Sequence, residues 1–340
     1  MDALHEVVPE VARRLPRLTL GEWPTPVEPL AAPGEVWVKR EDLSSPHYGG
    51  NKVRCLEPVL GALRAAGRDH VFATGAYGSN QALAHVVHGQ RHGFTCGALL
   101  FPQPASPTAS ANLRALAGLG PTLHLPRSIL SFPWDYWQLR RTGVAVVPPG
   151  AATPAGALGH LAAALEVALA VDAGDIPRPR HVVLPVGSTC TTAGLMLGFA
   201  LAAARGLGPP PHLLAVRVTP WPITAPWRIR RLARRAAALL ASLGGPVVEP
   251  AAVEVTGAFL GRGYGHATEA GRAAKATFAA LGGPVLDTTY SAKAAACLLA
   301  RDLDGPTLFW STKSKALPPA GDIRGLPPRI QAWIAQGEAR

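Results

Sequence analysis

The chain has 340 residues, of which 48% are hydrophobic and 16% are charged, and this composition excludes a largely disordered protein. Its length fits two domains. No charge-free apolar run reaches the length of a membrane span, and the first twenty residues lack a secretory core, so we expect no membrane partner and a cytoplasmic location.

Short β-type runs alternate with Ala- and Leu-rich helical runs along the chain. In order, we predict a strand at 35–39, a helix at 58–66, a strand at 70–74, a helix at 81–91, a strand at 95–101, a helix at 109–117, a strand at 122–125, a helix at 156–171, a strand at 181–186, a helix at 193–204, a strand at 213–218, helices at 229–243, 267–281 and 292–303, and a strand at 307–310. Near-continuous apolar strands alternating with helices predict an α/β fold with mostly parallel sheets flanked by helices.

The net charge of +11 raises nucleic acid as a partner, but the basic residues are scattered. One dense group exists, made of Arg228, Arg230, Arg231, Arg234 and Arg235. Its helical spacing favours a solvated helix face over an anionic-ligand or subunit contact or a nucleic-acid site. We therefore expect no nucleic-acid partner.

The sequence offers little support for a metal site. Its four cysteines, at positions 55, 96, 190 and 297, form no CxxC pair, so neither a disulfide framework nor structural zinc is predicted. His85, His88 and His92 would share a helix face, but no carboxylate lies near them in sequence. Packing or solvent exposure is favoured for these histidines, and we expect no metal.

Phosphate-loop, dinucleotide, nucleophile-elbow and HExxH signatures are all missing from the sequence. Parallel sheets bind ligands at turns that lead from strands into helices. The turn after the strand at 181–186 has the sequence Gly-Ser-Thr-Cys-Thr, which gathers backbone N–H groups and hydroxyls at a helix N-terminus. An anion cup for a phosphate is favoured there over simple helix capping.

The turn after the strand at 70–74 brings Ser79, Asn80 and Gln81 to a second helix N-terminus, where either a small carboxylate or simple capping would fit. Upstream, Gly49 and Gly50 precede Asn51 and Lys52. The chain has only six lysines, and one placed after a glycine turn is a candidate Schiff-base amine, although a solvated surface lysine would look the same in isolation.

Taken together, these segments resemble pyridoxal-phosphate enzymes of the D-cysteine desulfhydrase and 1-aminocyclopropane-1-carboxylate deaminase family, which share the tryptophan synthase β fold. The resemblance runs from about Trp23 to Thr312. It is carried by TPVEPL at 25–30, VKREDL at 38–43, GGNKVR at 49–54, GSNQ at 78–81, GSTCTTAGL at 187–195, GYG at 263–265 and TYSAKA at 289–294.

The resemblance implies roles for individual residues. Lys52 would hold pyridoxal 5′-phosphate through its amine and then move the substrate α-proton. Asn51 and Asn80 would contact the cofactor ring, and Ser79, Asn80 and Gln81 would receive the substrate carboxylate. The remaining site residues are a phosphate cup of Gly187, Ser188, Thr189, Cys190 and Thr191, the substrate-side tyrosines Tyr264 and Tyr290, and Thr312 at the pyridine nitrogen.

The resemblance also implies a larger cofactor domain of residues 1–47 and 160–340, a smaller domain of residues 48–159, and a homodimer. A hydroxyl at the pyridine nitrogen, and Ser291 after Tyr290, favour β-elimination from a small D-cysteine-like amino acid, giving a 2-oxo acid and ammonia. β-Replacement, racemisation or epimerisation, and 1-aminocyclopropane-1-carboxylate deamination are the alternatives, and a non-catalytic anion- or partner-binding relative is a further one.

Three departures from the family pattern bear on the reaction. Lys313 and Ser314 stand where relatives have glycines. Cys55 stands where relatives often have a basic residue directed at the phosphate, and Ala292 replaces a usual glycine. These changes lie around the predicted cofactor, so they leave its binding in place as an expectation and open the question of the substrate and reaction.

Overall fold

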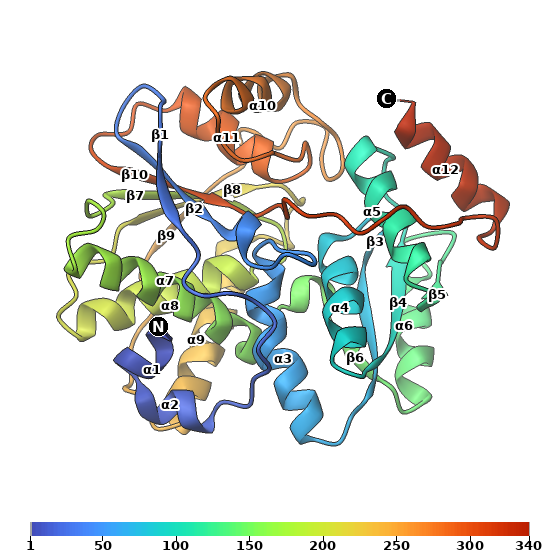
Figure 1. Cartoon of the computed structure of the whole chain (residues 1–340), viewed down its shortest axis with the longest axis horizontal. Helices are drawn as coiled ribbons and strands as arrows, with labels where there is room; N and C mark the ends of the chain where they lie inside the picture. The colour runs from blue at the N-terminus through green and yellow to red at the C-terminus, as the bar shows by residue number, and fades with distance from the viewer. Residues whose placement is uncertain (1, 340) are drawn as a thin grey trace.

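Two sheets organise the computed structural model, which describes residues 2–339 (Figure 1). The larger sheet has the strand order β1-β2-β10-β7-β8-β9 and the smaller one β5-β4-β3-β6. The larger sheet consists of β1 (Val27–Leu30), β2 (Val36–Arg40), β7 (His181–Val186), β8 (His212–Arg217), β9 (Val253–Thr256) and β10 (Thr307–Ser311). The smaller sheet consists of β3 (His70–Ala76), β4 (Thr95–Phe101), β5 (Thr122–His124) and β6 (Ala145–Val147).

The predicted α/β class with mostly parallel sheets is confirmed. Every strand pair is parallel except β1 with β2. The sequence did not predict β1, which contains Pro29. Proline lacks the N–H of a ladder donor, but β1 is an edge strand, where that loss is tolerated.

Helices cover both sheets and fill the space between them (Figure 1). They are α1 (Ala3–Val7), α2 (Pro9–Arg14), α3 (Lys52–Ala65), α4 (Asn80–Arg91), α5 (Pro107–Gly118), α6 (Phe132–Arg141), α7 (Pro154–Asp172), α8 (Cys190–Ala204), α9 (Pro226–Ser242), α10 (Glu269–Ala280), α11 (Ser291–Ala300) and α12 (Pro328–Glu338), with short 3-10 turns at Glu41–Leu43 and Pro149–Ala151. The sequence reading missed α1, α2, α6 and α12 and the strands β6 and β9.

The helix α3 begins at Lys52, six residues earlier than the predicted helix, and runs through Pro58. Proline in a helix leaves the carbonyl four residues earlier without its usual donor, here the carbonyl of Arg54. The helix α7 packs closely at this point: a Cβ added to Gly159 would lie 2.0 Å from the Arg54 carbonyl oxygen. The glycine therefore allows α7 to approach the helix that begins with Lys52.

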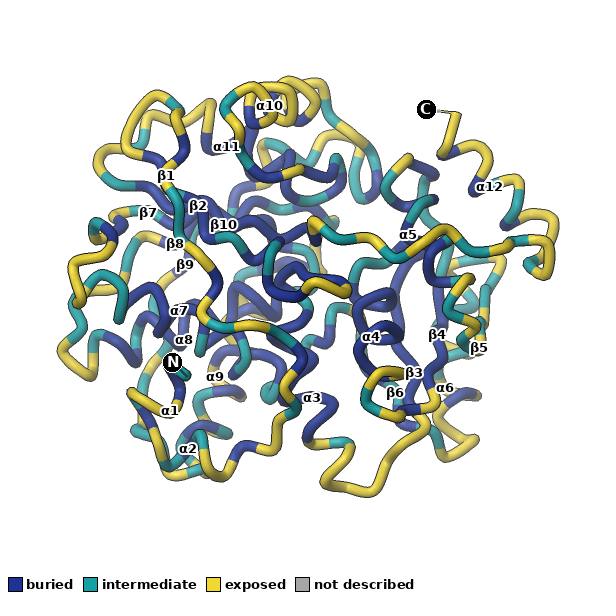
Figure 2. Tube along the Cα trace, viewed as in Figure 1, coloured by how far each residue is buried: buried dark blue, intermediate teal, exposed yellow. Residues whose placement is uncertain are grey.

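The same close approach continues between α7 and α8. A Cβ added to Gly194 would lie 2.3 Å from the carbonyl oxygen of Ala157, and one added to Gly198 would lie 2.6 Å from that of Leu161. The two helices therefore meet backbone to backbone in the buried centre of the larger unit, which Figure 2 shows in dark blue.

The helix α7 is long and apolar enough to cross a membrane by length and composition, yet 61% of its apolar 18-residue stretch is buried inside the protein. It packs against α3, α8 and α9. These contacts are those of a core helix.

The strands of the smaller sheet all lie within the predicted smaller domain, residues 48–159. Two features differ from the predicted bounds. The boundary at residue 160 falls inside α7, and α12, assigned to the larger domain, packs on α5 of the smaller unit, where Trp333 Nε1 donates to the Gln103 carbonyl at 2.7 Å (Figure 1). The domain bounds themselves stay a prediction.

The histidines of α4 have packing roles. His85 and His88 are buried, and their Nε2 atoms lie 3.3 Å from the Val71 carbonyl oxygen and 2.8 Å from the Tyr48 carbonyl oxygen. Burial lowers the pKa of each to about 4, so both are neutral at physiological pH. The favoured packing interpretation agrees with these contacts.

Candidate active site

The turn before Lys52 connects two other loops. A Cβ added to Gly50, which has φ +88°, would lie 2.7 Å from the carbonyl oxygen of Thr312. Asn51 donates from its backbone N–H to that oxygen at 3.3 Å and from Nδ2 to Thr191 Oγ1 at 2.9 Å. Lys52, the first residue of α3, therefore lies where the loops after β7 and β10 meet.

The predicted phosphate cup forms the turn between β7 and α8. Thr189 precedes α8 with φ +75°, a conformation that is strained for a β-branched residue. Such strain persists where the surrounding structure fixes it, and it is frequent at functional sites. The following backbone N–H groups begin a helix of 15 residues, whose N-terminus favours an anion.

The turn after β3 carries the residues predicted to receive the substrate carboxylate. Ser79 caps α4, since its Oγ accepts from the Ala82 N–H at 3.2 Å, which agrees with the capping interpretation and leaves the hydroxyl proton free to donate. Gln81 is only 2% exposed.

Asn80 lies in a polar group that connects both units. Its Oδ1 accepts from Asn112 Nδ2 at 2.7 Å, from the Tyr48 hydroxyl at 2.9 Å and from Lys313 Nζ at 3.3 Å. With Oδ1 fully engaged, Nδ2 is the atom of this side chain that remains to donate to a ligand. Tyr48 and Asn112 were not singled out in the sequence, because no short motif includes them.

Lys313 is buried in this group, and Nζ also lies 3.2 Å from Asn112 Oδ1. Burial lowers the pKa of Lys313 to about 8, against the opposing effect of the Asp287 charge. The departure from the family pattern therefore places a second amine, easily deprotonated, against a residue predicted to contact the cofactor.

Tyr264 and Tyr290 form a pair through their hydroxyl groups, with ring centroids 5.9 Å apart and planes at 76°. Burial raises the pKa of Tyr264 to about 12 and holds the pKa of Tyr290 well above its usual value. Both phenols are therefore protonated at neutral pH. The Tyr290 ring lies beside the phosphate cup, because a Cβ added to Gly187 would be 3.1 Å from its Cε1 atom.

Two charged residues missed by the sequence reading hold this pair. Asp287 Oδ1 accepts the backbone N–H of Tyr290 at 2.7 Å, and Oδ2 accepts the Ser291 hydroxyl at 2.9 Å. Lys293 Nζ donates to the carbonyls of Leu260 and Gly263 at 2.9 and 3.0 Å, next to Tyr264. The Ser291 hydroxyl is thus engaged in a hydrogen bond at the first turn of α11. The lysine inside the TYSAKA motif was the signal that the sequence offered.

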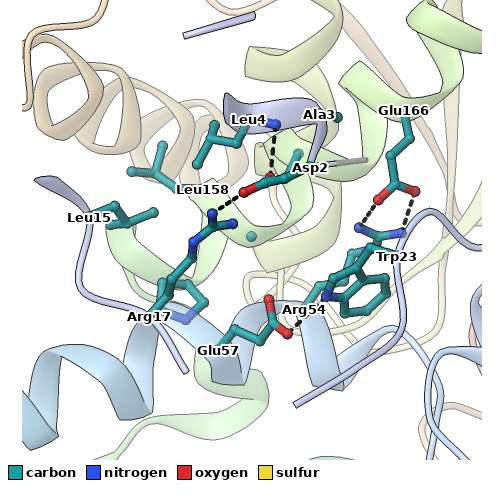
Figure 3. Close-up of a pocket in the computed structure, with 13 residues that line it drawn as sticks. Asp2, Ala3, Leu4, Leu15, Arg17, Trp23, Arg54, Glu57, Leu158 and Glu166 are labelled. Carbon is teal, nitrogen blue, oxygen red and sulfur yellow. Dashed lines mark hydrogen bonds and ion pairs between the residues drawn. The ribbon is translucent and has the colours of Figure 1, made fainter. Parts of the chain in front are cut away.

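A buried charge network supports the start of α3. Arg54 bonds to Glu41 at 2.6 Å and to Glu166 at 2.7 Å, and Glu166 also bonds to Lys39 Nζ at 2.7 Å. Figure 3 shows the Arg54–Glu166 pair beside a pocket that is also lined by Asp2 and Trp23. No residue predicted for the active site lines this pocket. The role of the charge network is to anchor α3, the helix that begins with Lys52.

Three polar groups on the site's segments are buried and have no hydrogen-bond partner among the described residues: the Gln81 amide, Thr192 Oγ1 and Ser311 Oγ. Each such group costs roughly 1–3 kcal/mol if it stays unpaired. A phosphorylated ligand with several polar atoms supplies partners of the required kind. Together with the anion-binding turn, these groups fit pyridoxal phosphate.

The sequence profile described as "Pyridoxal-phosphate dependent enzyme" matches residues 18–309. The chain belongs to this family. Its cofactor is pyridoxal phosphate, and the predicted family resemblance is confirmed.

Relatives within the pyridoxal-phosphate family cover nearly the whole chain. A Nocardicin C-9′ epimerase of Nocardia uniformis subsp. tsuyamanensis is 39% identical over 337 residues, covering 94% of this chain and 99% of its own. A D-cysteine desulfhydrase of Salmonella paratyphi A is 30% identical over 321 residues, covering 88% and 94%. A solved structure of an ACC deaminase homologue superposes with a TM-score of 0.76 at 24% identity, covering 96% and 98%, and this likeness shows the fold.

The relatives of this pyridoxal-phosphate enzyme thus include proteins named as lyases and deaminases. The structure brings Lys52, Asn51, Thr191 and Thr312 together and places Tyr290 against Gly187. Individual residue roles remain predictions.

Proposed function

We propose that this pyridoxal-phosphate enzyme inverts the configuration at the α-carbon of an amino-acid group. The observation that carries the proposal is the 39% identity to a Nocardicin C-9′ epimerase across almost the full length of both chains. Identity to D-cysteine desulfhydrase is lower, at 30%. The bound cofactor supplies the electron sink that makes an α-proton acidic, and the protein supplies the groups that move this proton.

Inversion requires that a proton leaves one face of the α-carbon and that another returns to the opposite face. We assign removal to the Lys52 amine and delivery to the Tyr264–Tyr290 pair. A group that returns a proton must be protonated at the working pH. Burial of these phenols supports the assignment, because it raises their pKa values and keeps both O–H groups intact.

The remaining site residues would bind and orient. The turn from Gly187 to Thr191 would hold the phosphate at the α8 N-terminus. Asn80 would donate from Nδ2 to the cofactor ring, since Oδ1 is engaged by three donors. Ser79 and Gln81 would donate to the substrate carboxylate, and the Thr312 hydroxyl would face the ring nitrogen.

The sequence-based hypothesis of β-elimination from a D-cysteine-like substrate is the second candidate. It is favoured by the desulfhydrase relative, whose similarity covers 88% of this chain. The same tyrosine pair would then protonate the leaving group. Because the Ser291 hydroxyl bonds to Asp287, it gives this candidate less support than the sequence suggested.

An exchange experiment in deuterium oxide distinguishes the two reactions. Purified holoenzyme is incubated with single enantiomers of cysteine and serine and with nocardicin, followed by chiral chromatography, mass spectrometry and a 2-oxo acid assay. Epimerisation yields the opposite configuration carrying α-deuterium without 2-oxo acid. Formation of pyruvate, ammonia and sulfide from D-cysteine, with no inversion of any compound, would refute the proposal and establish the elimination.

We also propose a homodimer, as the family resemblance implies, and a cytoplasmic location, as the sequence led us to expect. Sedimentation equilibrium of the holoenzyme gives the mass directly. A mass equal to one chain of 35.4 kDa at micromolar concentration would reject the dimer.

A further inference from the structure

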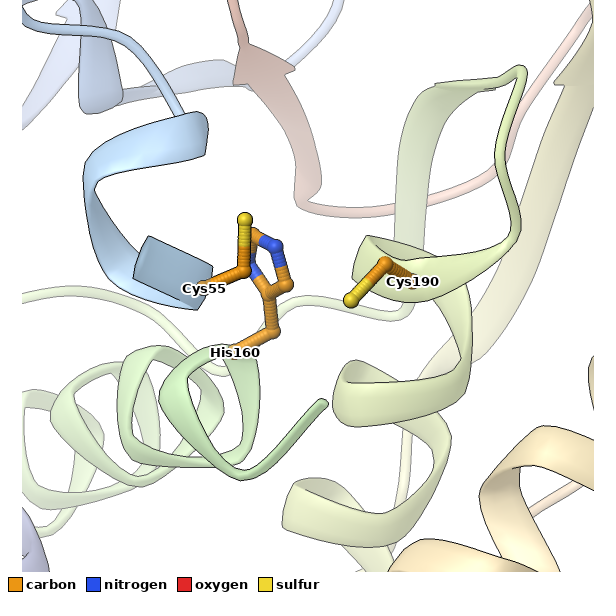
Figure 4. A group of neighbouring side chains, drawn as sticks. All are labelled: Cys55, His160 and Cys190. Atoms are coloured by element: carbon orange, nitrogen blue, oxygen red, sulfur yellow. The ribbon is translucent and has the colours of Figure 1, made fainter. Parts of the chain in front are cut away.

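Three side chains meet next to the predicted phosphate cup, to which one of them, Cys190, belongs through its backbone N–H. Cys55 comes from α3, His160 from α7 and Cys190 from the first position of α8. All three are fully buried, and one potential ligand atom from each lies within 4.8 Å of the others. Figure 4 shows both sulfurs turned toward the imidazole ring.

We propose that Cys55, His160 and Cys190 form a binding site for one thiophilic divalent metal ion, zinc in the cell and cadmium as its laboratory substitute. Two thiolates and one neutral imidazole around a dication make a neutral unit, which a buried position tolerates. The absence of a carboxylate from the group selects against magnesium and calcium.

The distances suit such an ion. Zinc binds sulfur at about 2.3 Å and imidazole nitrogen at about 2.0–2.1 Å, so neighbouring tetrahedral ligand atoms lie roughly 3.4–3.8 Å apart. Ligand atoms already within 4.8 Å need shifts of about an ångström. Three protein ligands would leave the fourth tetrahedral coordination position of the ion open. This position would face the carbonyls of Gly150 and Ala151, which lie next to the Cys55 and Cys190 sulfurs.

The imidazole gives a second, independent indication. His160 Nδ1 is buried without a hydrogen-bond partner among residues 2–339, while Nε2 lies 3.2 Å from Thr191 Oγ1. The ring also interacts with the Cys55 thiol, so the imidazole already faces one of the two sulfurs. Metal-bound histidines commonly bond through the second nitrogen to a polar group that fixes the ring, and Thr191 is placed for this. The unpaired nitrogen thereby acquires a partner.

The proposed metal ion does not contact the pyridoxal phosphate, but it lies next to residues predicted to bind this cofactor. Cys190 would offer its backbone N–H to the phosphate and its side chain to the metal. The Cys55 thiol donates to the carbonyl of Lys52 at 3.1 Å, and Thr191 bonds to Asn51 at 2.9 Å. The metal would join α3, α7 and α8 under the site, so its binding should stabilise the whole chain against heat.

Metal content and ligand type test the proposal. Holoenzyme purified without chelators from zinc-supplemented cells is expected to contain one zinc per chain by elemental analysis. Its X-ray absorption spectrum should show two sulfur ligands at about 2.3 Å. Background zinc, or a zinc shell without sulfur, would overturn the proposal, and this measurement depends on no variant.

The variants C55S and C190S identify the ligands, with C96S and C297S as matched buried-cysteine controls. Added Cd²⁺ should give sulfur-to-cadmium absorption with one equivalent in the wild type and both controls, and at least a tenfold loss of bound metal in C55S and C190S. Equal binding in all variants would refute the assignment. So would a Cys55–Cys190 disulfide found by mass spectrometry of freshly isolated protein, since the pair would then serve a redox role.

Discussion

The ammonium of Lys313 lies 3.3 Å from Asn80 Oδ1, so a second lysine reaches a residue predicted to contact the cofactor. The family resemblance led us to expect a glycine at this position, which would supply no such cation. Lys313 closes a hydrogen-bond group with Tyr48 and Asn112 that fixes which side of the Asn80 amide remains available. Lys313, which departs from the family pattern, is therefore a buried part of the predicted site and not an exposed residue at its edge.

Lys313 should make stability depend on pH. Its pKa falls from 10.5 in the unfolded chain to about 8 in the fold. Below pH 8 both states carry the charge and burial opposes folding. Between pH 8 and 10.5 the unfolded chain retains the proton that the fold has lost, so stability rises with pH. The K313M variant should lack this contribution. Urea unfolding of both cofactor-free proteins between pH 7 and 10 measures it.

The exposed Lys275 on α10 supplies the control for this comparison. We expect the pH profile of K275M to run parallel to that of the wild type. Parallel profiles for K313M and the wild type would show that Lys313 does not titrate in this range.

Replacing Lys52 by alanine should abolish the visible absorption of the bound cofactor and lower kcat by at least about 10³-fold, because both the attachment and the proton transfer depend on its amine. Absorption spectra and turnover of the purified variant measure these effects, and circular dichroism verifies the fold. K275A should behave as the wild type. A K52A protein that keeps the band and its turnover would show that another lysine holds the cofactor.

The tyrosine pair should separate exchange from inversion. In Y264F and Y290F the cofactor should still bind, while inversion slows about 10²–10⁴-fold through loss of the donor O–H. Lys52 would still exchange the α-proton of one enantiomer with solvent. Deuterium uptake compared with chiral analysis measures both. The variant Y136F, at a half-buried tyrosine on α6, is the control. Equal loss of exchange and inversion in Y264F would contradict the two-face assignment.

The buried charge network should be sensitive to the loss of one partner. The substitution R54M leaves Glu41 and Glu166 buried beside a single remaining cation, Lys39, and we expect destabilisation of about 3–5 kcal/mol in urea unfolding. The exposed pair Arg234–Glu249 gives the comparison, with under about 1 kcal/mol expected for R234M. Equal effects of both substitutions would mean that burial does not set the contribution of the network.

The sequence predicted the parallel α/β fold well, because alternating apolar strands and helices are local patterns. It missed β1, where a proline occupies an edge strand, and the true start of α3, because proline usually marks a helix beginning. It predicted no metal site. Cys55, His160 and Cys190 come together only through packing of three helices, which no spacing rule detects.

The predicted site residues were found through short motifs, and the structure adds the residues that fix them. Asp287 and Lys293 act on the tyrosines through backbone atoms, while Tyr48 and Asn112 act through Asn80. Tyr48 and Asn112 are each 32 residues from Asn80 in the sequence, whereas Asp287 and Lys293 lie close to Tyr290 but are common residue types. They become visible only when burial and hydrogen bonds are known.

The backbone-to-backbone packing of α7 with α3 and α8 has a consequence for mutational tolerance. At Gly159, Gly194 and Gly198 a single added methyl group would meet a carbonyl oxygen at 2.0, 2.3 and 2.6 Å. In a saturation library selected for function, these three positions should therefore accept almost no replacement, although none of them has a side chain that could touch cofactor, substrate or metal. The freedom to evolve new substrates would be confined to the loops above the helices, while the helices beneath stay invariant.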